Sequence, residues 1–262
     1  MAKIHPSAVI DPRARLADDV EIGPYVVIEG EVEFGAGCVV GAFCRFEGPT
    51  TIGEGNRFIS HASIGAPPQD LKYKGDPTRL EIGPDNVFRE FVNINRGTPG
   101  GGGVTRIGSH GLYMVSAHIA HDCQVGDHVI FANNGTLAGH VHVGSYSTVG
   151  ALTAVHQFCA IGEYAFIGGG TIVTKDVLPY MKTVGDRPAR CYGPNSVGLE
   201  RRGFSEERIR ALKAAWRLLH NPKLTTTEAL ARIEAELAGA PDAVRLLEFI
   251  RASQRGVILA SG

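Results

Sequence analysis

Large apolar residues recur every six positions along most of this chain. The first series runs without a break from Ile4 to Ile64 and resumes in phase from Ile82 to Ile94. A second series, shifted by one residue, runs from Ile107 to Val173. A helix repeats every 3.6 residues and an ordinary strand every two, so neither sustains a period of six. A solenoid of very short strands joined by tight turns does, because each strand places one large side chain inward.

The residues beside each apolar position favour a narrow, triangular cross-section. The residue two positions earlier is usually small, as at Ala62, Ala117 and Thr153. Glycine follows many of the apolar positions, and we expect it to provide positive φ at sharp corners. That set comprises Gly23, Gly35, Gly41, Gly53, Gly65, Gly83, Gly108, Gly126, Gly144, Gly150, Gly162 and Gly168. Three consecutive hexapeptides would make one coil, and stacked coils would give three parallel sheets.

The pattern resembles the left-handed parallel β-helix of the hexapeptide-repeat acyltransferases. The resemblance implies a mainly β fold, and the handedness is taken from that family because ordinary crossovers are right-handed. We expect the β-helix acyltransferase domain to occupy residues 1–190. Two loops are predicted to leave it, at 65–80 and 95–106, where prolines, aspartates and glycines interrupt the apolar series. Loops held on a rigid scaffold often carry function.

Beyond residue 190 helical signals replace the period of six, and they predict a C-terminal α-helical domain over 191–262. Three helices are expected: 206–220 capped by Ser205, one from the capping box of Thr225 and Glu228 to about Gly239, and 242–254 after Pro241. We expect this domain to pack on the end of the β-helix.

Composition places the chain among ordinary globular proteins. Its 262 residues are 44% hydrophobic, with 26 basic against 27 acidic residues. That balance gives no support for nucleic-acid binding. No apolar run approaches the roughly 20 residues of a transmembrane segment, and the first residues do not read as a signal peptide. We therefore expect a cytoplasmic protein.

The cysteines favour a structural role. Four of the five occupy the small position before an apolar residue, at Cys38, Cys44, Cys123 and Cys159. Small hydrophobic residues belong at such positions, so we expect buried, reduced thiols. The absence of a Cys-x-x-Cys pair in the sequence argues against a zinc site built from them.

Three of the histidines are spaced by close to one coil. The step from His121 to His140 is one position longer than three hexapeptides. The step from His140 to His156 is two positions shorter than three hexapeptides. We therefore expect these residues near one edge on successive coils, about 5 Å apart per layer. His118 precedes His121 by three positions, and Asp122 occupies the coil position that His140 takes one turn later. Three interpretations are open: a solvated face, a zinc site as in the gamma-class carbonic anhydrases that share this β-helix, and acid–base catalysis.

Five motifs occurring in order narrow this choice. They are 69–73 (QDLKY), 117–123 (AHIAHDC), 137–141 (LAGHV), 154–158 (AVHQF) and 198–204 (GLERRGF). With the two loops and the helical tail, they resemble the UDP-N-acetylglucosamine O-acyltransferase family of lipid A biosynthesis over essentially the whole chain. That family transfers a 3-hydroxyacyl chain from acyl carrier protein to the 3-hydroxyl group of UDP-N-acetylglucosamine.

The resemblance implies a role for each matching residue. His121 would be the general base, Asp122 its orienting partner, and the Gly139 backbone N–H the donor to the thioester oxyanion. Substrate positioning would fall on Gln69, Asp70, Lys72, His118, His140, His156 and Gln157, and on Asn195, Arg201 and Arg202 near phosphate groups. Gly169 matches a position that limits acyl length, and its missing side chain predicts a longer acyl chain. Val197 departs from the family's glutamate, which puts one uracil or ribose contact in doubt.

The resemblance also implies partners. Family members are homotrimers with active sites between subunits, and the flat faces of a prism are compatible with such association. No metal or diffusible redox cofactor is implied, because the donor is a phosphopantetheine-linked thioester on acyl carrier protein. Arg208, Arg210, Lys213 and Arg217 are candidates to receive that carrier, although a solvated face explains them equally well.

Other functions stay open at this point. An N-acyltransferase could act on a 3-amino UDP-sugar or at a later acylation step. A zinc-dependent, carbonic anhydrase-like hydratase and a non-catalytic scaffold are the remaining alternatives.

Overall fold

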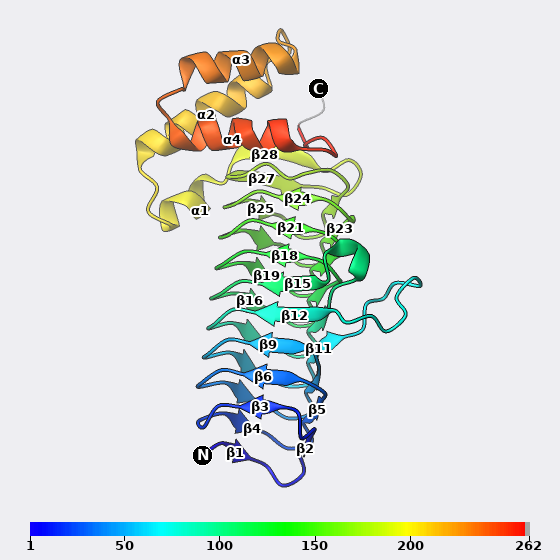
Figure 1. The fold of residues 1–262 in the computed structure, drawn as a ribbon. Helices are drawn as coiled ribbons and strands as arrows, with labels where there is room; N and C mark the ends of the chain where they lie inside the picture. Colours follow the sequence, from blue (N-terminus) through cyan, green and yellow to red (C-terminus); the bar gives the residue numbers. More distant parts are fainter. Residues whose placement is uncertain (260–262) are drawn as a thin grey trace.

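The chain forms a parallel β-solenoid with helices at its C-terminal end (Figure 1). The structure is a computed structural model and describes residues 1–259. Each coil contributes one strand to each of three sheets. Paired strands usually lie three hexapeptides apart in the sequence, as where Ile4 pairs with Ile22 and Ile130 with Thr148. The predicted solenoid and its period are therefore confirmed.

Three sheets run along the solenoid. Sheet A contains β1 (Lys3–Ile4), β4 (Glu21–Ile22), β7 (Val39–Val40), β10 (Arg57–Phe58), β13 (Val87–Phe88), β16 (Leu112–Tyr113), β19 (Ile130–Phe131), β22 (Thr148–Val149), β25 (Phe166–Ile167), β27 (Met181–Val184) and β28 (Arg190–Pro194). Sheet B contains β2 (Val9–Ile10), β5 (Val27–Glu29), β8 (Arg45–Glu47), β11 (Ser63–Ala66), β14 (Asn93–Asn95), β17 (His118–Ile119), β20 (Thr136–Leu137), β23 (Ala154–Val155) and β26 (Ile172–Val173). Sheet C contains β3 (Arg15–Leu16), β6 (Val32–Phe34), β9 (Thr50–Ile52), β12 (Arg79–Ile82), β15 (Val104–Ile107), β18 (Gln124–Val125), β21 (His142–Val143) and β24 (Ala160–Ile161).

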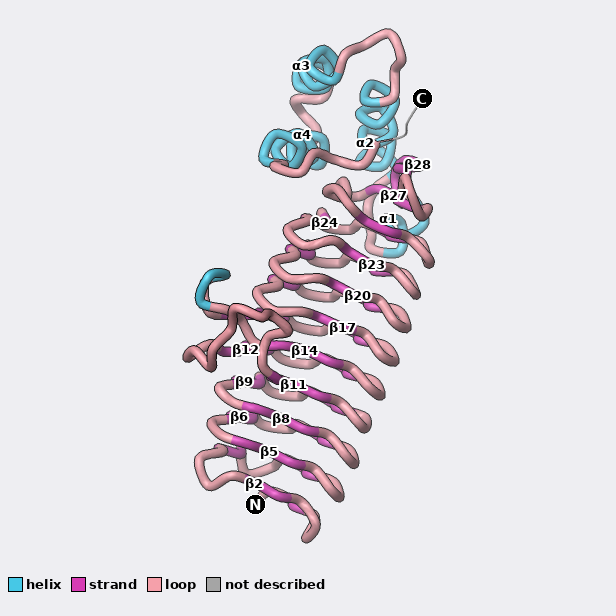
Figure 2. The backbone as a smooth tube through the Cα atoms, turned by 90° about the vertical axis from the view of Figure 1, so that its right-hand side faces the viewer, coloured by secondary structure: helices cyan, strands magenta, loops and turns pink. Residues whose placement is uncertain are grey.

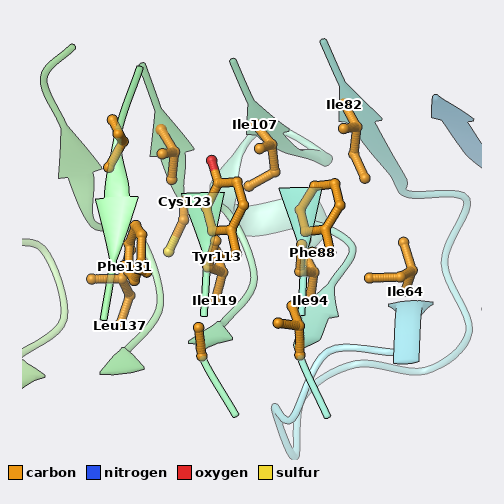
Figure 3. Packing of buried hydrophobic residues seen from close by; sticks show 14 of the residues in the cluster. Ile64, Ile82, Phe88, Ile94, Ile107, Tyr113, Ile119, Cys123, Phe131 and Leu137 are labelled. Carbon is orange, nitrogen blue, oxygen red and sulfur yellow. The ribbon is translucent and has the colours of Figure 1, made fainter. Parts of the chain in front are cut away.

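The six-residue series fills the interior of the prism. Figure 3 shows Ile94, Ile119 and Leu137 from sheet B beneath Phe88, Tyr113 and Phe131 from sheet A. The aromatic rings stack from coil to coil, with centroids 4.8 Å apart between Phe88 and Tyr113 and 5.4 Å between Tyr113 and Phe131. All five cysteines are buried free thiols, which confirms the structural role expected for them.

The explanation expected for the glycines is wrong. Of the twelve that follow apolar positions, only Gly65 has a positive φ, at 79°. The left-handed corner positions hold residues such as Tyr25, Asp122 and His140 instead. Glycine is needed because coils approach closely: a Cβ on Gly41 would overlap the carbonyl oxygen of Ile59 on the next coil.

Two coils are longer than the others because each carries an insertion. Ile52 pairs with Ile82 and Leu80 pairs with Thr105, whereas regular partners lie three hexapeptides apart. The separation between Ile52 and Ile82 is a multiple of six, so the first insertion keeps the apolar series in phase. The separation between Leu80 and Thr105 is one position longer than a multiple of six, so the second insertion causes the phase shift in the sequence. The insertions are shorter than predicted, at 67–78 and 96–103, since the flanking residues belong to β11, β12, β14 and β15. The second contains the 3₁₀ helix η1 (Pro99–Gly101), and both leave on the same side of the solenoid (Figures 1 and 2).

The C-terminal helices pack on the end of the prism. They are α1 (Ser196–Arg201), α2 (Glu206–Leu219), α3 (Thr226–Glu236) and α4 (Pro241–Ala252). The expected caps are present: the Ser205 side chain accepts from the Arg208 N–H, and Thr225 and Glu228 form a reciprocal capping box. Helix α1 was not predicted, and α3 ends before Gly239.

The junction between prism and helices does not fall at a single residue. Strand β27 lies before the predicted boundary at residue 190 and pairs with β28, most of which lies after it. The helices begin only at Ser196. The division into domains 1–190 and 191–262 therefore stays a prediction. Every helix among the described residues is too short or too polar to span a lipid bilayer.

Candidate active site

The candidate residues gather at the corner between sheets B and C. Residues 120–123 form this corner between β17 and β18, and 138–141 and 156–159 form it on the next two coils. Asp122, His140 and Phe158 occupy the same left-handed position, with φ of 61°, 62° and 63°. His121 precedes Asp122 and Gly139 precedes His140, so both stand one position earlier on adjacent coils. The fold thus stacks residues that lie one coil apart in the sequence.

His121 and Asp122 form a hydrogen-bonded pair. The distance from His121 Nδ1 to Asp122 Oδ2 is 2.7 Å, and the Asp122 side chain is 0% exposed. Because a carboxylate only accepts, Nδ1 carries the proton and Nε2 of the neutral ring keeps its lone pair. The ring lies against Gly139, where a Cβ would come within 2.5 Å of His121 Cε1. Glycine at this position is therefore what makes room for the imidazole.

Two further imidazoles border this pair. His140 Nε2 lies 3.7 Å from Asp122 Oδ2, and the His140 ring stands perpendicular to that of His121 with centroids 5.1 Å apart. Burial lowers the pKa of His140, although the charge of Asp122 opposes this. His118 Nδ1 contacts Asn93 Oδ1 at 2.7 Å, and burial, followed by the charge of His121, lowers the pKa of His118. Both rings are therefore neutral near pH 7.

The predicted row of three imidazoles is only partly formed. His156 lies at the same corner one coil further on, but its side chain is exposed and its Nδ1 contacts the Gln157 carbonyl oxygen at 3.0 Å. Among residues 1–259 its ring makes no hydrogen bond or ring-stacking contact with His121 or His140. It occupies the first position of the corner, whereas His140 occupies the third, so spacing close to one coil did not align the rings.

The insertion 67–78 lies near the same corner. Asp70 is close enough to His140 for its charge to raise that residue's pKa against the larger effect of burial. The Asp70 side chain also accepts from the Lys72 N–H at 2.9 Å, and the side chains of Gln69 and Lys72 are exposed. The structure therefore brings Asp70 toward His140, and the substrate-binding roles of Gln69, Asp70 and Lys72 stay predictions.

Four predicted residues lie at other corners of the prism. Asn195, Arg201 and Arg202 border a hollow of about 500 Å³ that includes Tyr146, at the corner between sheets C and A. The Arg202 guanidinium lies 5.1 Å from the centroid of the Tyr146 ring. Gly169 belongs to the corner between sheets A and B. A single chain thus does not bring these residues to His121.

Known proteins resemble this chain over nearly its whole length. A family model described as "Udp N-acetylglucosamine O-acyltransferase; Domain 2" matches residues 176–258. The acyl-[acyl-carrier-protein]–UDP-N-acetylglucosamine O-acyltransferase of Thiobacillus denitrificans is 50% identical over 258 residues, which cover 98% of this chain and 100% of that protein. The Myxococcus xanthus protein of the same name is 50% identical over 257 residues, covering 98% and 99%.

The chain belongs to the UDP-N-acetylglucosamine O-acyltransferase family. Solved structures agree along the whole fold. The O-acyltransferase of Moraxella catarrhalis superposes with a TM-score of 0.94 at 42% identity, covering 97% of this chain and 99% of that one. The Francisella novicida acyltransferase gives 0.95 at 34% identity, covering 99% and 95%. The expected left-handed β-helix and acyltransferase class are thereby confirmed.

The basic residues of α2 do not all face solvent freely. Arg208 donates to the buried Asp242 through two bonds of 2.7 Å, and its guanidinium lies 3.6 Å from the centroid of the Phe204 ring. It therefore stabilises the packing of α2 on α4. Arg210, Lys213 and Arg217 remain exposed.

Several residues of the site were missed by sequence reasoning. Phe158 stacks on His140 with centroids 4.5 Å apart, and its place one regular coil beyond His140 could have revealed it. Thr98 contacts Asp122 from within an insertion, outside the regular spacing, so no sequence signal marks it. Thr105 lies in β15 close to one regular coil before Asp122, so spacing could have revealed this contact. His121, Asp122 and His140 form the one group of three or more residues within 1–259 whose potential metal-ligand atoms all lie within 4.8 Å of one another.

Proposed function

We propose that this chain transfers a 3-hydroxyacyl group from acyl carrier protein to the 3-hydroxyl group of UDP-N-acetylglucosamine, the first step of lipid A biosynthesis. The observation that carries the proposal is the His121–Asp122 pair, 2.7 Å apart, with the His121 side chain 14% exposed. It occurs in a chain that is about half identical to O-acyltransferases over their whole length.

In the proposed step His121 acts as general base. Its Nε2 takes the proton of the sugar hydroxyl group while that oxygen attacks the thioester carbonyl carbon. The tetrahedral intermediate then expels the phosphopantetheine thiolate, which receives the proton back from His121. Asp122 fixes the ring orientation and stabilises the imidazolium between these transfers. A positioned base of this kind contributes roughly 10²–10⁴-fold in rate.

Gly139 is suited to stabilise the oxyanion of the intermediate. Within residues 1–259 its N–H donates to no protein acceptor, whereas the next N–H, of His140, donates to the His121 carbonyl oxygen at 3.0 Å. A Cβ on Gly139 would overlap the His121 ring, so this glycine lies beside the proposed base. One preorganised donor of this kind is worth on the order of 3 kcal/mol.

The complete site is proposed to need two copies of the chain. Asn195, Arg201 and Arg202 lie at a different corner from His121, so a neighbouring copy would have to present them. A homotrimer, in which each prism offers one corner to each neighbour, satisfies this requirement. The donor protein, acyl carrier protein, would dock on the exposed Arg210, Lys213 and Arg217 of α2.

The proposed location is the cytoplasm, and the reaction draws on no metal or redox cofactor. Five buried free cysteines are typical of a reducing compartment. The group of His121, Asp122 and His140 keeps a zinc-dependent hydratase as the alternative to be tested.

The test is a transfer assay on the purified protein with 3-hydroxyacyl carrier protein. UDP-N-acetylglucosamine and its 3-amino analogue are offered as acceptors, and the zinc content of the same preparation is measured. We expect an ester of UDP-N-acetylglucosamine as the main product from protein without stoichiometric zinc. Preferred amide formation would assign an N-acyltransferase instead. Stoichiometric zinc with no acyl transfer would assign the hydratase.

A further inference from the structure

The glycine-rich insertion 96–103 has no part in the function proposed so far, yet it touches the site at its most buried point. Thr98 donates to both oxygens of Asp122: its N–H lies 2.8 Å from Oδ1 and its Oγ1 lies 2.6 Å from Oδ2. Thr98 is 5% exposed and the Asp122 side chain is 0% exposed. Thr98 and His121 thus supply all three hydrogen bonds that the carboxylate accepts among the described residues.

The rest of the insertion is shaped around the same carboxylate. Gly101 lies over it, and a Cβ there would collide with the carboxyl carbon and both oxygens of Asp122. A Cβ on the preceding Gly100 would meet nothing within 4 Å. From the other side, Thr105 Oγ1 accepts from the Asp122 N–H at 2.8 Å. The segment therefore closes over Asp122 with a glycine at the place where a side chain would collide with the carboxylate.

The folding of the insertion itself does not use these donors. The turn is closed by the Thr98 carbonyl oxygen, which accepts from the N–H groups of Gly101 and Gly103 at 3.1 and 2.8 Å. The hydroxyl and N–H groups of Thr98 are left for Asp122. A buried carboxylate is stable only when donors replace the water it has lost.

We infer that Thr98 is a positioning residue for acyl transfer. It fixes the Asp122 carboxylate so that Oδ2 points at His121 Nδ1, and Gly101 provides the space in which this arrangement fits. Without the hydroxyl donor, Oδ2 is free to rotate away from His121, and the ring loses the orientation that presents Nε2 to the substrate. The inference rests on the proposed role of His121 as base.

The first experiment compares Thr98→Val with Thr98→Ser by steady-state kinetics of acyl transfer. Valine removes the hydroxyl group at similar volume, and we expect kcat to fall about 10- to 100-fold with KM for both substrates within about threefold, the scale of losing an orienting partner. Serine restores the donor and should keep kcat within about threefold. Thr50→Val is the matched control, because Thr50 is equally buried and its Oγ1 donates to the Glu47 carbonyl oxygen, also at 2.6 Å.

The second experiment compares two neighbouring glycines. Gly101→Ala should lower kcat at least tenfold, because the methyl group occupies the place of the carboxylate. Gly100→Ala should keep wild-type kinetics, because its methyl group points into open space. Thermal unfolding of all variants shows whether each remains folded.

The outcomes separate this inference from the proposed function. If Thr98→Val keeps wild-type kcat while His121→Ala is inactive, the base stands and the role of Thr98 is refuted. A KM effect without a kcat effect, or equal losses in Gly100→Ala and Gly101→Ala, also overturns it. If the unaltered protein transfers no acyl group, it is the proposed function that fails.

Discussion

Tyr113 stands in the core at a position where the neighbouring coils carry Phe88 and Phe131. Its hydroxyl group is buried without a hydrogen-bond partner among the described residues, and burial raises the pKa of the phenol. A buried unpaired hydroxyl costs about 1–3 kcal/mol. We therefore expect Tyr113→Phe to raise the free energy of unfolding by about 1 kcal/mol in chemical denaturation. A clear loss of stability would mean that the hydroxyl group is satisfied.

The imidazoles of the site make stability depend on pH. Burial lowers the pKa of His118 and His140 in the folded protein. At pH values between these lowered pKa values and the ordinary histidine pKa of about 6.5, the unfolded chain therefore binds protons that the folded chain does not. In that window the free energy of unfolding rises with pH. The thermal midpoint should fall as the pH drops from about 7 to about 5, and less steeply in His118→Asn. An identical slope in both proteins would contradict this reading of His118.

Residues of the site differ in how far the sequence could reveal them. His121, Asp122 and His140 were predictable because they sit on the regular repeat, where a separation of about three hexapeptides means adjacency. Thr98 was not, since it lies in an insertion and reaches Asp122 24 residues away. The step from His140 to His156 resembles one coil too, but resemblance in spacing does not make two rings occupy the same corner position.

At the scale of the element, the corners of the coils decide stability. A methyl group on Gly41 would overlap the backbone of Ile59 on the next coil, which can move only if two strands separate. Gly41→Ala should therefore cost more than about 2 kcal/mol of stability. Gly239→Ala, whose methyl group meets nothing within 4 Å, should change stability by less than about 0.5 kcal/mol. Equal midpoints for the two variants in thermal unfolding would show that the coils can adjust.

The strands were predictable because each hexapeptide carries its own signal. The helices with recognisable caps, α2 and α3, were predictable for the same reason. Helix α1 has only six residues and no side-chain cap, so nothing local marks it. The glycines were misread because their requirement comes from the neighbouring coil, which a single repeat does not show.

At the scale of the whole molecule, the site residues divide between corners. If neighbouring copies complete the site, chains lacking His121 and chains lacking Arg202 should complement each other. Co-expressed His121→Ala and Arg202→Ala chains should regain up to about a quarter of wild-type activity, because random mixing pairs intact corners at that frequency. Each variant alone should stay far lower. No recovery in verified mixed oligomers would mean that each chain holds its site alone.

The central claim is that the imidazole beside Asp122 removes the proton of the acceptor hydroxyl group. Acyl transfer by His121→Ala tests it most directly, with His110→Ala as control. His110 also faces a carboxylate, with its Nδ1 3.6 Å from Asp85 Oδ2, but at the corner between sheets C and A. We predict that kcat falls roughly 10²–10⁴-fold in His121→Ala and stays near the wild-type value in His110→Ala, with both proteins folded. A His121→Ala protein that transfers acyl groups about as fast as the control would contradict the account.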